Sequence, residues 1–540
     1  MTISGNIADV INQEFYPGTI YVRNGKIAEI KREPGKIYPL YIVPGLVDSH
    51  VHIESSMVVP TEFARAASVH GTVAAVSDPH EIANVLGMKG VEFMLENARN
   101  TPFKFAFGAP SCVPATTFET SGQTLGQVET DELLSRKDIK YLSEMMNFPG
   151  VLYDDPNVWK KIELAKKYNK PIDGHAPGLD DAAIKKYAQA GISTDHETFT
   201  LEEARRKISA GMKIMIREGS AAKNFEALVP LLKESPEFVM FCSDDKHPDD
   251  LLSGHINLLI KRALELGYDF FSVIRAATLN PVRHFSLEAG LLQKGDNADF
   301  IIIDSPKNFN VIETIINGQV AAEKGNSYLP TIIPAVVNNF QISEKKVEEF
   351  QIEAKSDIIK VIGAIDGELI TEKLLFPVKV DGNNIISDVK SDVLKIAVIN
   401  RYNESKPSIG FIHGFGIKSG AIAASVGHDS HNIIAVGVSD KDICRAVNLI
   451  ISEKGGLTAV YGDREHILPL PIAGIISDKD LKTVAKSYSE IDKKVKAMGC
   501  KLKSPFMTLS FMALPVIPKL KITDKGLFDV DKFAFTDIFK

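Results

Sequence analysis

The stretch YIVPGLVDSHVHIESS (residues 41–56) joins an apolar run of strand length to a pair of histidines. His50 and His52 are two residues apart, so on a strand both imidazoles point to the same face and can reach one cation. Seven further apolar runs of strand length follow between residues 72 and 245, and amphipathic helical patterns separate most of them. Buried strands that alternate with helices predict a parallel sheet with helices outside it.

The number of these strand candidates favours a closed barrel. Eight of them within about 245 residues match the size of a (β/α)8 barrel of the TIM type, which we expect over residues 45–290. An open, doubly wound sheet is the alternative, but no GxGxxG motif follows any early strand. Within the barrel, Thr200 precedes Glu203 by the three residues of a capping box, which predicts that a helix begins there.

The segments on either side of the barrel have a different sequence pattern. Residues 1–44 and 291–328 are rich in β-branched side chains and contain Asn-Gly turns, so together they predict one small β domain. Residues 329–540 hold alternating strand patterns and a glycine-dense stretch, which predict a C-terminal α+β domain. The expected fold class is therefore α/β, with a TIM-like barrel, a small flanking β domain and a C-terminal α+β domain.

The charge and cysteine content narrow the expected partners and location. Among 540 residues, 62 Lys and Arg against 69 Asp and Glu give a net charge of −7, which gives no support to a basic nucleic-acid-binding surface. No apolar run reaches the roughly 20 residues of a membrane span, and no secretory signal is visible at the start. The four cysteines are scattered without a CxxC pair. We expect a cytoplasmic enzyme with no nucleic-acid or membrane partner.

Polar side chains end most of the predicted strands, and barrels of this type carry their active sites at the carboxyl ends of their strands. Many of these side chains are of metal-binding type: His50, His52, Asp78, His80, Glu144, His175, His196 and Asp244. Six of them, at the ends of strands one, four, five, six and eight, should meet at one barrel mouth: His50, His52, Glu144, His175, His196 and Asp244. Six nitrogen and oxygen ligands, with one carboxylate able to bridge, suit two divalent cations.

A second cluster lies in the C-terminal segment GHDSHN, which carries His428, Asp429 and His431. We expect these side chains to bind substrate or a further metal, or to form a lid over the barrel mouth. A turn whose polar groups satisfy the local backbone is the alternative. The glycines of this segment favour a tight loop that approaches another group.

Several of these motifs resemble those of one enzyme family. PGLVDSHVHIESS is similar to the first-strand motif of the metal-dependent amidohydrolase superfamily. Within it, SDPHEIANVLG, SEMMNFPGVL, IDGHAPG, STDHE, CSDD and the GHDSHN segment resemble the bacterial type of adenine deaminase, and the resemblance covers essentially the whole chain. It implies hydrolytic deamination of adenine to hypoxanthine and ammonia, in purine salvage or catabolism, with a binuclear manganese or iron centre. Manganese is the metal we expect first.

The resemblance also implies how the metal ligands are shared. His50, His52 and Asp244 match ligands of one metal, His175 and His196 match ligands of the second, and Glu144 matches the bridging carboxylate. Cyclic-amide hydrolases of the same superfamily bridge their metals with a carbamylated lysine on strand four. Here Lys140 lies at the start of that strand, which is the wrong end, so a lysine bridge is disfavoured.

The expected mechanism uses a hydroxide that forms between the two cations and attacks C6 of adenine. Asp244 accepts the hydroxide proton and passes it to the departing amine. Glu81 and Glu197, ahead of His80, are the candidates to protonate the ring, provided that burial raises the pKa of the carboxyl group. The alternative roles are orientation of His196 for Glu197 and helix capping for Glu81.

Two further expectations concern residues and assembly beyond the metal centre. Ser111 is a candidate for the lining of the base pocket, whereas Cys112 and Cys242 are not needed as nucleophiles. We expect a homo-oligomer, a dimer or larger. Two other functions remain open: an amidohydrolase acting on a different aminopurine or cyclic amidine, and a scaffold that has lost its metals. The scaffold is disfavoured because none of the six ligand positions is vacant.

Overall fold

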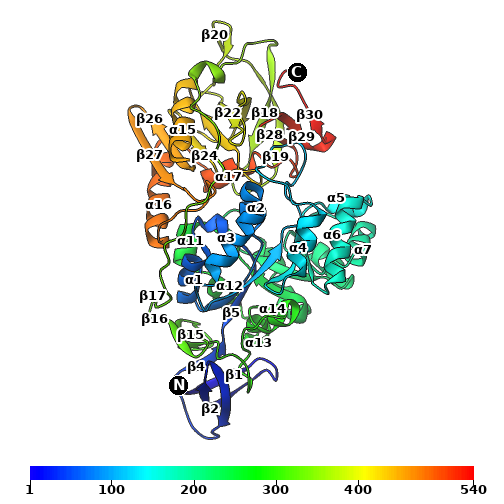
Figure 1. The fold of residues 1–540 in the computed structure, drawn as a ribbon, viewed down its shortest axis with the longest axis vertical. Coiled ribbons are helices and arrows are strands. Elements are labelled where there is room, and N and C mark those ends of the chain that lie inside the picture. Colours follow the sequence, from blue (N-terminus) through cyan, green and yellow to red (C-terminus); the bar gives the residue numbers. More distant parts are fainter.

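A computed structural model describes residues 1–540, and Figure 1 shows the N-terminal and C-terminal parts at opposite ends of the longest axis, with a barrel between them. The N-terminal end is a sheet with the strand order β17-β16-β15-β14-β4-β1-β2-β3. Its strands are β1 (Thr2–Asp9), β2 (Glu14–Arg23), β3 (Lys26–Arg32), β4 (Tyr41–Pro44), β14 (Phe300–Ile303), β15 (Val311–Ile316), β16 (Gln319–Glu323) and β17 (Asn326–Ser327). Ile42 of β4 pairs with Ile7 on one side and Ile302 on the other, so segments from before and after the barrel share one sheet.

The middle part confirms the predicted parallel barrel. Its strands are β5 (Leu46–His52), β6 (Thr72–Ser77), β7 (Lys104–Ala109), β8 (Ile139–Met145), β9 (Ile172–Gly174), β10 (Thr194–Asp195), β11 (Lys213–Arg217) and β12 (Val239–Cys242). Consecutive strands pair in parallel from β5 to β9 and from β10 to β12. A parallel bridge between Ile172 and Ile192 joins the two runs, and β13 (Asp244–Asp245) returns to pair with β5, which closes the barrel.

Helices follow the strands and cover the outside of the barrel (Figure 1). They are α1 (Pro60–Val69), α2 (His80–Leu86), α3 (Met88–Ala98), α4 (Gln127–Ser135), α5 (Phe148–Leu152), α6 (Pro156–Lys167), α7 (Asp181–Gln189), α8 (Leu201–Ser209), α9 (Phe225–Leu228), α10 (Leu231–Glu234), α11 (Pro248–Ser253), α12 (Ile256–Glu265), α13 (Phe270–Ala276) and α14 (Leu279–Phe285). The predicted start of α8 is confirmed, since the Thr200 hydroxyl accepts from the Glu203 amide at 3.2 Å. None of the helices has the length and apolar character that a membrane crossing requires.

The strands of the barrel are buried on both faces, as the near-continuous apolar runs predict. Every residue of β5 and of β6 is buried. The carboxyl ends of these strands therefore carry polar side chains that water hardly reaches, and those side chains must find partners within the protein.

The C-terminal part is a second sheet of eight strands with the order β19-β18-β23-β22-β25-β24-β26-β27. These strands are β18 (Ile358–Ala364), β19 (Thr371–Pro377), β22 (Val393–Ile399), β23 (Ser408–His413), β24 (Ala421–Ala424), β25 (Ile433–Gly437), β26 (Gly456–Tyr461) and β27 (Arg464–Pro469). Smaller strands and helices complete it: β20 (Val380–Asp381), β21 (Asn384–Ile385), α15 (Asp440–Glu453), α16 (Leu481–Ala497), α17 (Pro505–Phe511), β28 (Leu520–Thr523), β29 (Gly526–Asp529) and β30 (Ala534–Phe535).

The loop after β7 connects the barrel to this C-terminal part. The Asn432 side chain donates to the carbonyl of Thr120 at 2.9 Å, and the Thr120 amide donates to Asp524 at 2.9 Å. The Thr523 hydroxyl donates to the carbonyl of Phe118, also at 2.9 Å. Because this loop starts at the carboxyl end of a barrel strand, these bonds hold the C-terminal part over the barrel mouth.

Candidate active site

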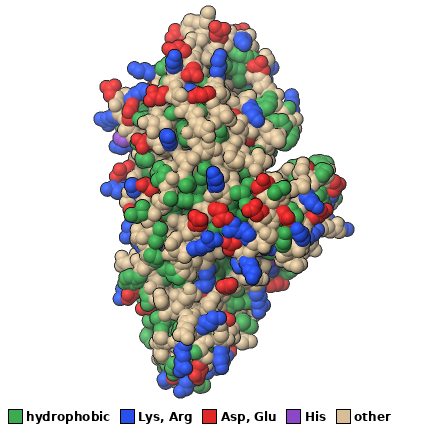
Figure 2. Space-filling view, viewed as in Figure 1, with side chains coloured by type: hydrophobic (Ala, Val, Ile, Leu, Met, Phe, Trp, Pro, Cys, Tyr) green, Lys and Arg blue, Asp and Glu red, His purple; other side chains and the backbone are tan.

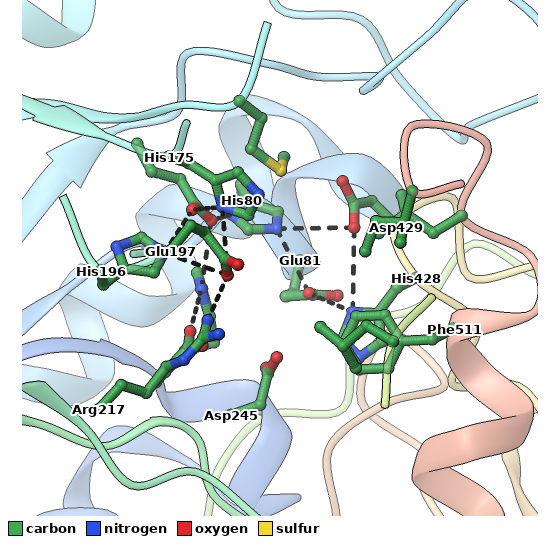
Figure 3. A pocket seen from close by; sticks show the side chains of 17 residues that line it. His80, Glu81, His175, His196, Glu197, Arg217, Asp245, His428, Asp429 and Phe511 are labelled. Atoms are coloured by element: carbon green, nitrogen blue, oxygen red, sulfur yellow. Dashed lines mark hydrogen bonds and ion pairs between the residues drawn. The ribbon is translucent and has the colours of Figure 1, made fainter. Parts of the chain in front are cut away.

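A small cavity lies at the barrel mouth, between the strand ends and the C-terminal part (Figure 3). Five of the six predicted metal ligands line it, and the sixth, His50, lies directly behind His52 with ring nitrogens 3.2 Å apart. The structure thus brings together side chains from β5, β8, β13 and the loops after β9 and β10.

The two histidines of β5 direct their Nε2 atoms to the same place. His50 Nδ1 lies 2.7 Å from Asp173, and His52 Nδ1 lies 3.2 Å from the carbonyl of Asp78. Carboxylates and carbonyls only accept, so each Nδ1 carries a hydrogen, and in the neutral ring the lone pair is then on Nε2, where it can bind a cation. The two Nε2 atoms are 3.2 Å apart. Two lone pairs at this distance repel one another unless a cation lies between them.

Glu144 at the end of β8 faces two groups of histidines with its two oxygens. Oε1 lies 3.3 Å from His52 Nε2. Oε2 lies 2.7 Å from His175 Nδ1 and 3.1 Å from His196 Nε2. One carboxylate oxygen is therefore directed to each group, which is the arrangement that a carboxylate shared by two cations requires.

Asp244 completes the first group and is held by an arginine that the sequence motifs do not single out. Asp244 Oδ1 lies 3.2 Å from His52 Nε2 and 3.6 Å from His50 Nε2. Its Oδ2 accepts from Arg217 at 2.7 Å, and Arg217 also pairs with Glu197. Burial raises the pKa of Asp244, but Arg217 and the two histidines outweigh burial and hold it well below its usual range. The sequence could have indicated Arg217 as a residue of the site, because it ends the seventh strand run, KIMIREGS.

Glu81, at the start of α2, is clamped by the GHDSHN segment. Its Oε1 lies 2.6 Å from His428 Nδ1 and 3.3 Å from His80 Nε2, and its Oε2 pairs with His431. Burial acts to raise the pKa of Glu81, but His428 and His431 outweigh it and hold the pKa well below its usual value. The condition on which Glu81 was a candidate ring acid, a pKa raised by burial, is therefore not met, because imidazoles from the distant GHDSHN segment surround it.

The pKa of Glu197 is also lowered, so the condition for its role as a ring acid is not met either. Burial acts to raise the pKa of Glu197, and Arg217, His175 and His196 together lower it. Glu197 lines the cavity beside His196, but its carboxylate is turned to Arg217 and to His175 Nδ1, 3.8 Å away. Its surroundings therefore resemble those of an orienting group more than those of an acid.

The C-terminal part also supplies an apolar wall that the sequence analysis missed. Leu369, Phe511, Leu514 and Ile517 line the cavity opposite the metal-binding side chains. The Phe511 ring is stacked on His428, with ring centroids 4.4 Å apart and an angle of 18° between the planes. Asp429 lies beside them, with Oδ1 4.0 Å from His80 Nε2 (Figure 3). No polar motif marks this wall, because α17 and its neighbours read as ordinary core sequence.

Four other residues that the sequence analysis discussed lie outside the cavity lining. The Ser111 hydroxyl donates to the carbonyl of Glu144, so Ser111 supports that residue instead of lining the base pocket. Cys112 and Cys242 are buried, and burial raises the pKa of both thiols, which keeps them protonated. Lys140 is the second residue of β8 and lines a separate cavity with Lys104 and Phe105, which begin β7. A lysine bridge at the metal-binding end is therefore excluded.

Comparison with known proteins gives matches over the whole chain. A family model described as Amidohydrolase family matches residues 41–321, and one described as Adenine deaminase C-terminal domain matches residues 368–534. The adenine deaminase of Sulfurovum sp. (strain NBC37-1) is 52% identical over 538 residues, which cover 99% of both chains. The adenine deaminase of Salinibacter ruber is 50% identical over 541 residues, which cover 100% of this chain and 99% of that one. The similarity includes the barrel and the C-terminal part alike.

Proposed function

The chain belongs to the adenine deaminase family of amidohydrolases, and we propose that it hydrolyses adenine to hypoxanthine and ammonia at a pair of divalent cations. The full-length identity of about half with adenine deaminases carries the reaction class. The two oxygens of Glu144, each directed to its own group of histidines, support the pair of cations.

The donor set fits two cations. We propose that His50, His52 and Asp244 hold one of them, that His175 and His196 hold the other, and that Glu144 is shared. The facing lone pairs of His50 and His52 support the first position. A mixed set of imidazoles and carboxylates accepts manganese or iron, and metal supply decides between such ions in a cell. We propose manganese as the working metal.

When bound, two divalent cations supply a hydroxide near neutral pH, and the protein positions the groups that move protons. Asp244 takes the proton of the attacking oxygen and delivers it to the amine that leaves C6, as ammonia. Arg217 keeps Asp244 ionised and fixes its orientation, so the carboxylate is ready to accept. Attack at C6 also places electron density on N1 of the purine, which then needs a proton.

The pair formed by Glu81 and His428 is the source of that proton in our proposal. Burial acts to lower the pKa of His428, but Glu81 outweighs it and raises the pKa to about 9. At neutral pH His428 is therefore protonated and Glu81 is ionised, and the proton between them can pass to N1. His80, 3.3 Å from Glu81, lies next to this path and stabilises the carboxylate.

The remaining surroundings suit a small neutral base. The wall of Leu369, Phe511, Leu514 and Ile517 offers a face for a planar purine. Figure 2 shows basic and acidic side chains interspersed on the face it presents, which supports a small-molecule substrate over a nucleic acid. The four cysteines are unpaired, which supports our proposal of a cytoplasmic location, and we further propose a homo-oligomer.

One experiment tests the reaction. The purified protein, supplied with manganese, is given adenine, guanine and cytosine in parallel, and ammonia is measured. We expect ammonia from adenine alone. Ammonia from guanine but not from adenine would overturn the substrate. Metal analysis accompanies the assay: about two ions per chain are expected, whereas far fewer ions together with no activity would favour a scaffold that lacks catalysis.

A further inference from the structure

Arg217 lines the cavity and carries hydrogen-bond donors that have no partner. Its side chain is 1% exposed, and Nη1 makes its bonds to Asp244 and Glu197. Nε and Nη2 have no partner. A buried donor without a partner costs free energy, so an arginine in this state points to an acceptor that arrives with a ligand. Arg217 lines the cavity and reaches toward its centre (Figure 3).

Most other polar groups of the cavity are engaged or are acceptors themselves. One ring nitrogen each of His52, His175 and His196 faces Glu144. The nitrogens left without a partner, His80 Nδ1 and His196 Nδ1, belong to imidazoles, which carry no permanent charge. His80 and His428 face Glu81 on the opposite side of the cavity from Arg217 (Figure 3). The remaining polar lining residues are carboxylates, which cannot donate when ionised. Arg217 is thus the one lining side chain with permanently charged donors left over for a ligand.

The chemistry of the reaction decides which ring nitrogen suits these donors. N1 and N7 lie on the two sides of C6 in adenine, and both are acceptors. N1 must gain a proton during the attack, and a guanidinium cannot supply one because it stays protonated at all working pH values. N7 keeps its lone pair throughout the reaction, so a donor that holds without releasing its proton fits N7.

We propose that Arg217 binds N7 of the purine and thereby determines substrate specificity. The inference rests on the proposed function. In this proposal the neighbouring donors of the guanidinium take the N7 side of C6, because Nη1 lies 2.7 Å from Asp244, the group that acts at C6. The pair of Glu81 and His428 then takes the N1 side. Cytosine has no ring nitrogen that corresponds to N7, so this contact excludes it.

The test compares adenine with 7-deazaadenine, in which a C–H group replaces N7, for the wild type and for Arg217→Met. In the wild type, kcat/KM should fall about 10- to 100-fold on removal of N7, the worth of one hydrogen bond from a charged donor. In Arg217→Met the fall in kcat/KM on removal of N7 should be smaller than in the wild type by about this factor. Comparing ratios removes both the intrinsic reactivity of the analogue and any loss that comes from a displaced Asp244.

A control substrate shows whether the contact is made to N7 or to another ring nitrogen. With 3-deazaadenine, kcat/KM relative to adenine should fall by the same factor in the wild type and in Arg217→Met. If the penalty for 7-deazaadenine persists in Arg217→Met, or if the 3-deaza penalty disappears instead, the N7 assignment is wrong. Binding of hypoxanthine and 7-deazahypoxanthine to the wild type, measured by inhibition, needs no variant, and equal affinities would also overturn it. A wild type that does not deaminate adenine would contradict the proposed function itself.

Discussion

Lys521 allows a direct test of the interactions that stabilise the apolar wall of the cavity. It lies on β28 with no exposed surface, and its ammonium donates to the carbonyls of Leu369 and Phe511 at 2.8 and 2.9 Å. Both of those residues line the cavity. No charged side chain offsets the burial of Lys521, so burial alone lowers its pKa from 10.5 to about 7.

The sign of the effect on stability follows from this shift. Between pH 7 and pH 10.5 the unfolded chain, with its ordinary lysine, binds more protons at this position than the folded chain does. The free energy of unfolding therefore rises with pH in this window, and the stabilisation is lost as pH falls toward 7. From pH 7 to pH 9 the contribution of Lys521 amounts to about 2 kcal/mol. Lys521→Met removes it.

Urea unfolding of the wild type and of Lys521→Met, followed by circular dichroism at pH 7 and pH 9, measures this contribution. The gain in unfolding free energy between the two pH values should be about 2 kcal/mol smaller in the variant. Lys360→Met is the matched control, because Lys360 also donates to two backbone carbonyls of the C-terminal part, those of Asp537 and Phe539, but is only partly buried. A pH dependence in Lys521→Met equal to that of the wild type would refute the reasoning.

Three other variants test the groups at the barrel mouth. Asp244→Asn should keep the circular dichroism spectrum and reduce turnover about a thousandfold or more, since a ligand and a proton shuttle are lost together; near-normal turnover would remove Asp244 from that role. Glu144→Gln should lower the metal content measured by mass spectrometry, and unchanged occupancy would argue against a shared carboxylate. In the wild type, kcat should fall as pH rises through about 9, where His428 loses its proton. In Glu81→Gln the fall in kcat should occur at lower pH, because burial lowers the pKa of His428 and the Glu81 carboxylate no longer opposes it. Identical pH profiles of the wild type and Glu81→Gln would contradict the role of this pair.

The sequence by itself determined the barrel and most of its metal-binding mouth. Strand-length apolar runs fixed the eight strands, because strands that are buried on both faces must be apolar throughout. Polar residues at the ends of those runs could then only lie at one rim, which is why His50, Glu144, His175 and Asp244 could be grouped without coordinates. The capping pattern at Thr200 worked for the same reason, since it is a local signal.

Only the tertiary structure decided the surroundings that set the charge of these groups. Glu81 was a candidate ring acid provided that burial raised its pKa, but His428 and His431 come to it from a distant part of the chain and hold the pKa low. Phe511 and Lys521 belong to segments that read as plain core, and they matter because the C-terminal part packs over the barrel mouth. Sequence patterns report burial and local geometry, whereas the pKa of a buried group depends on which charges the fold places within a few ångströms of it.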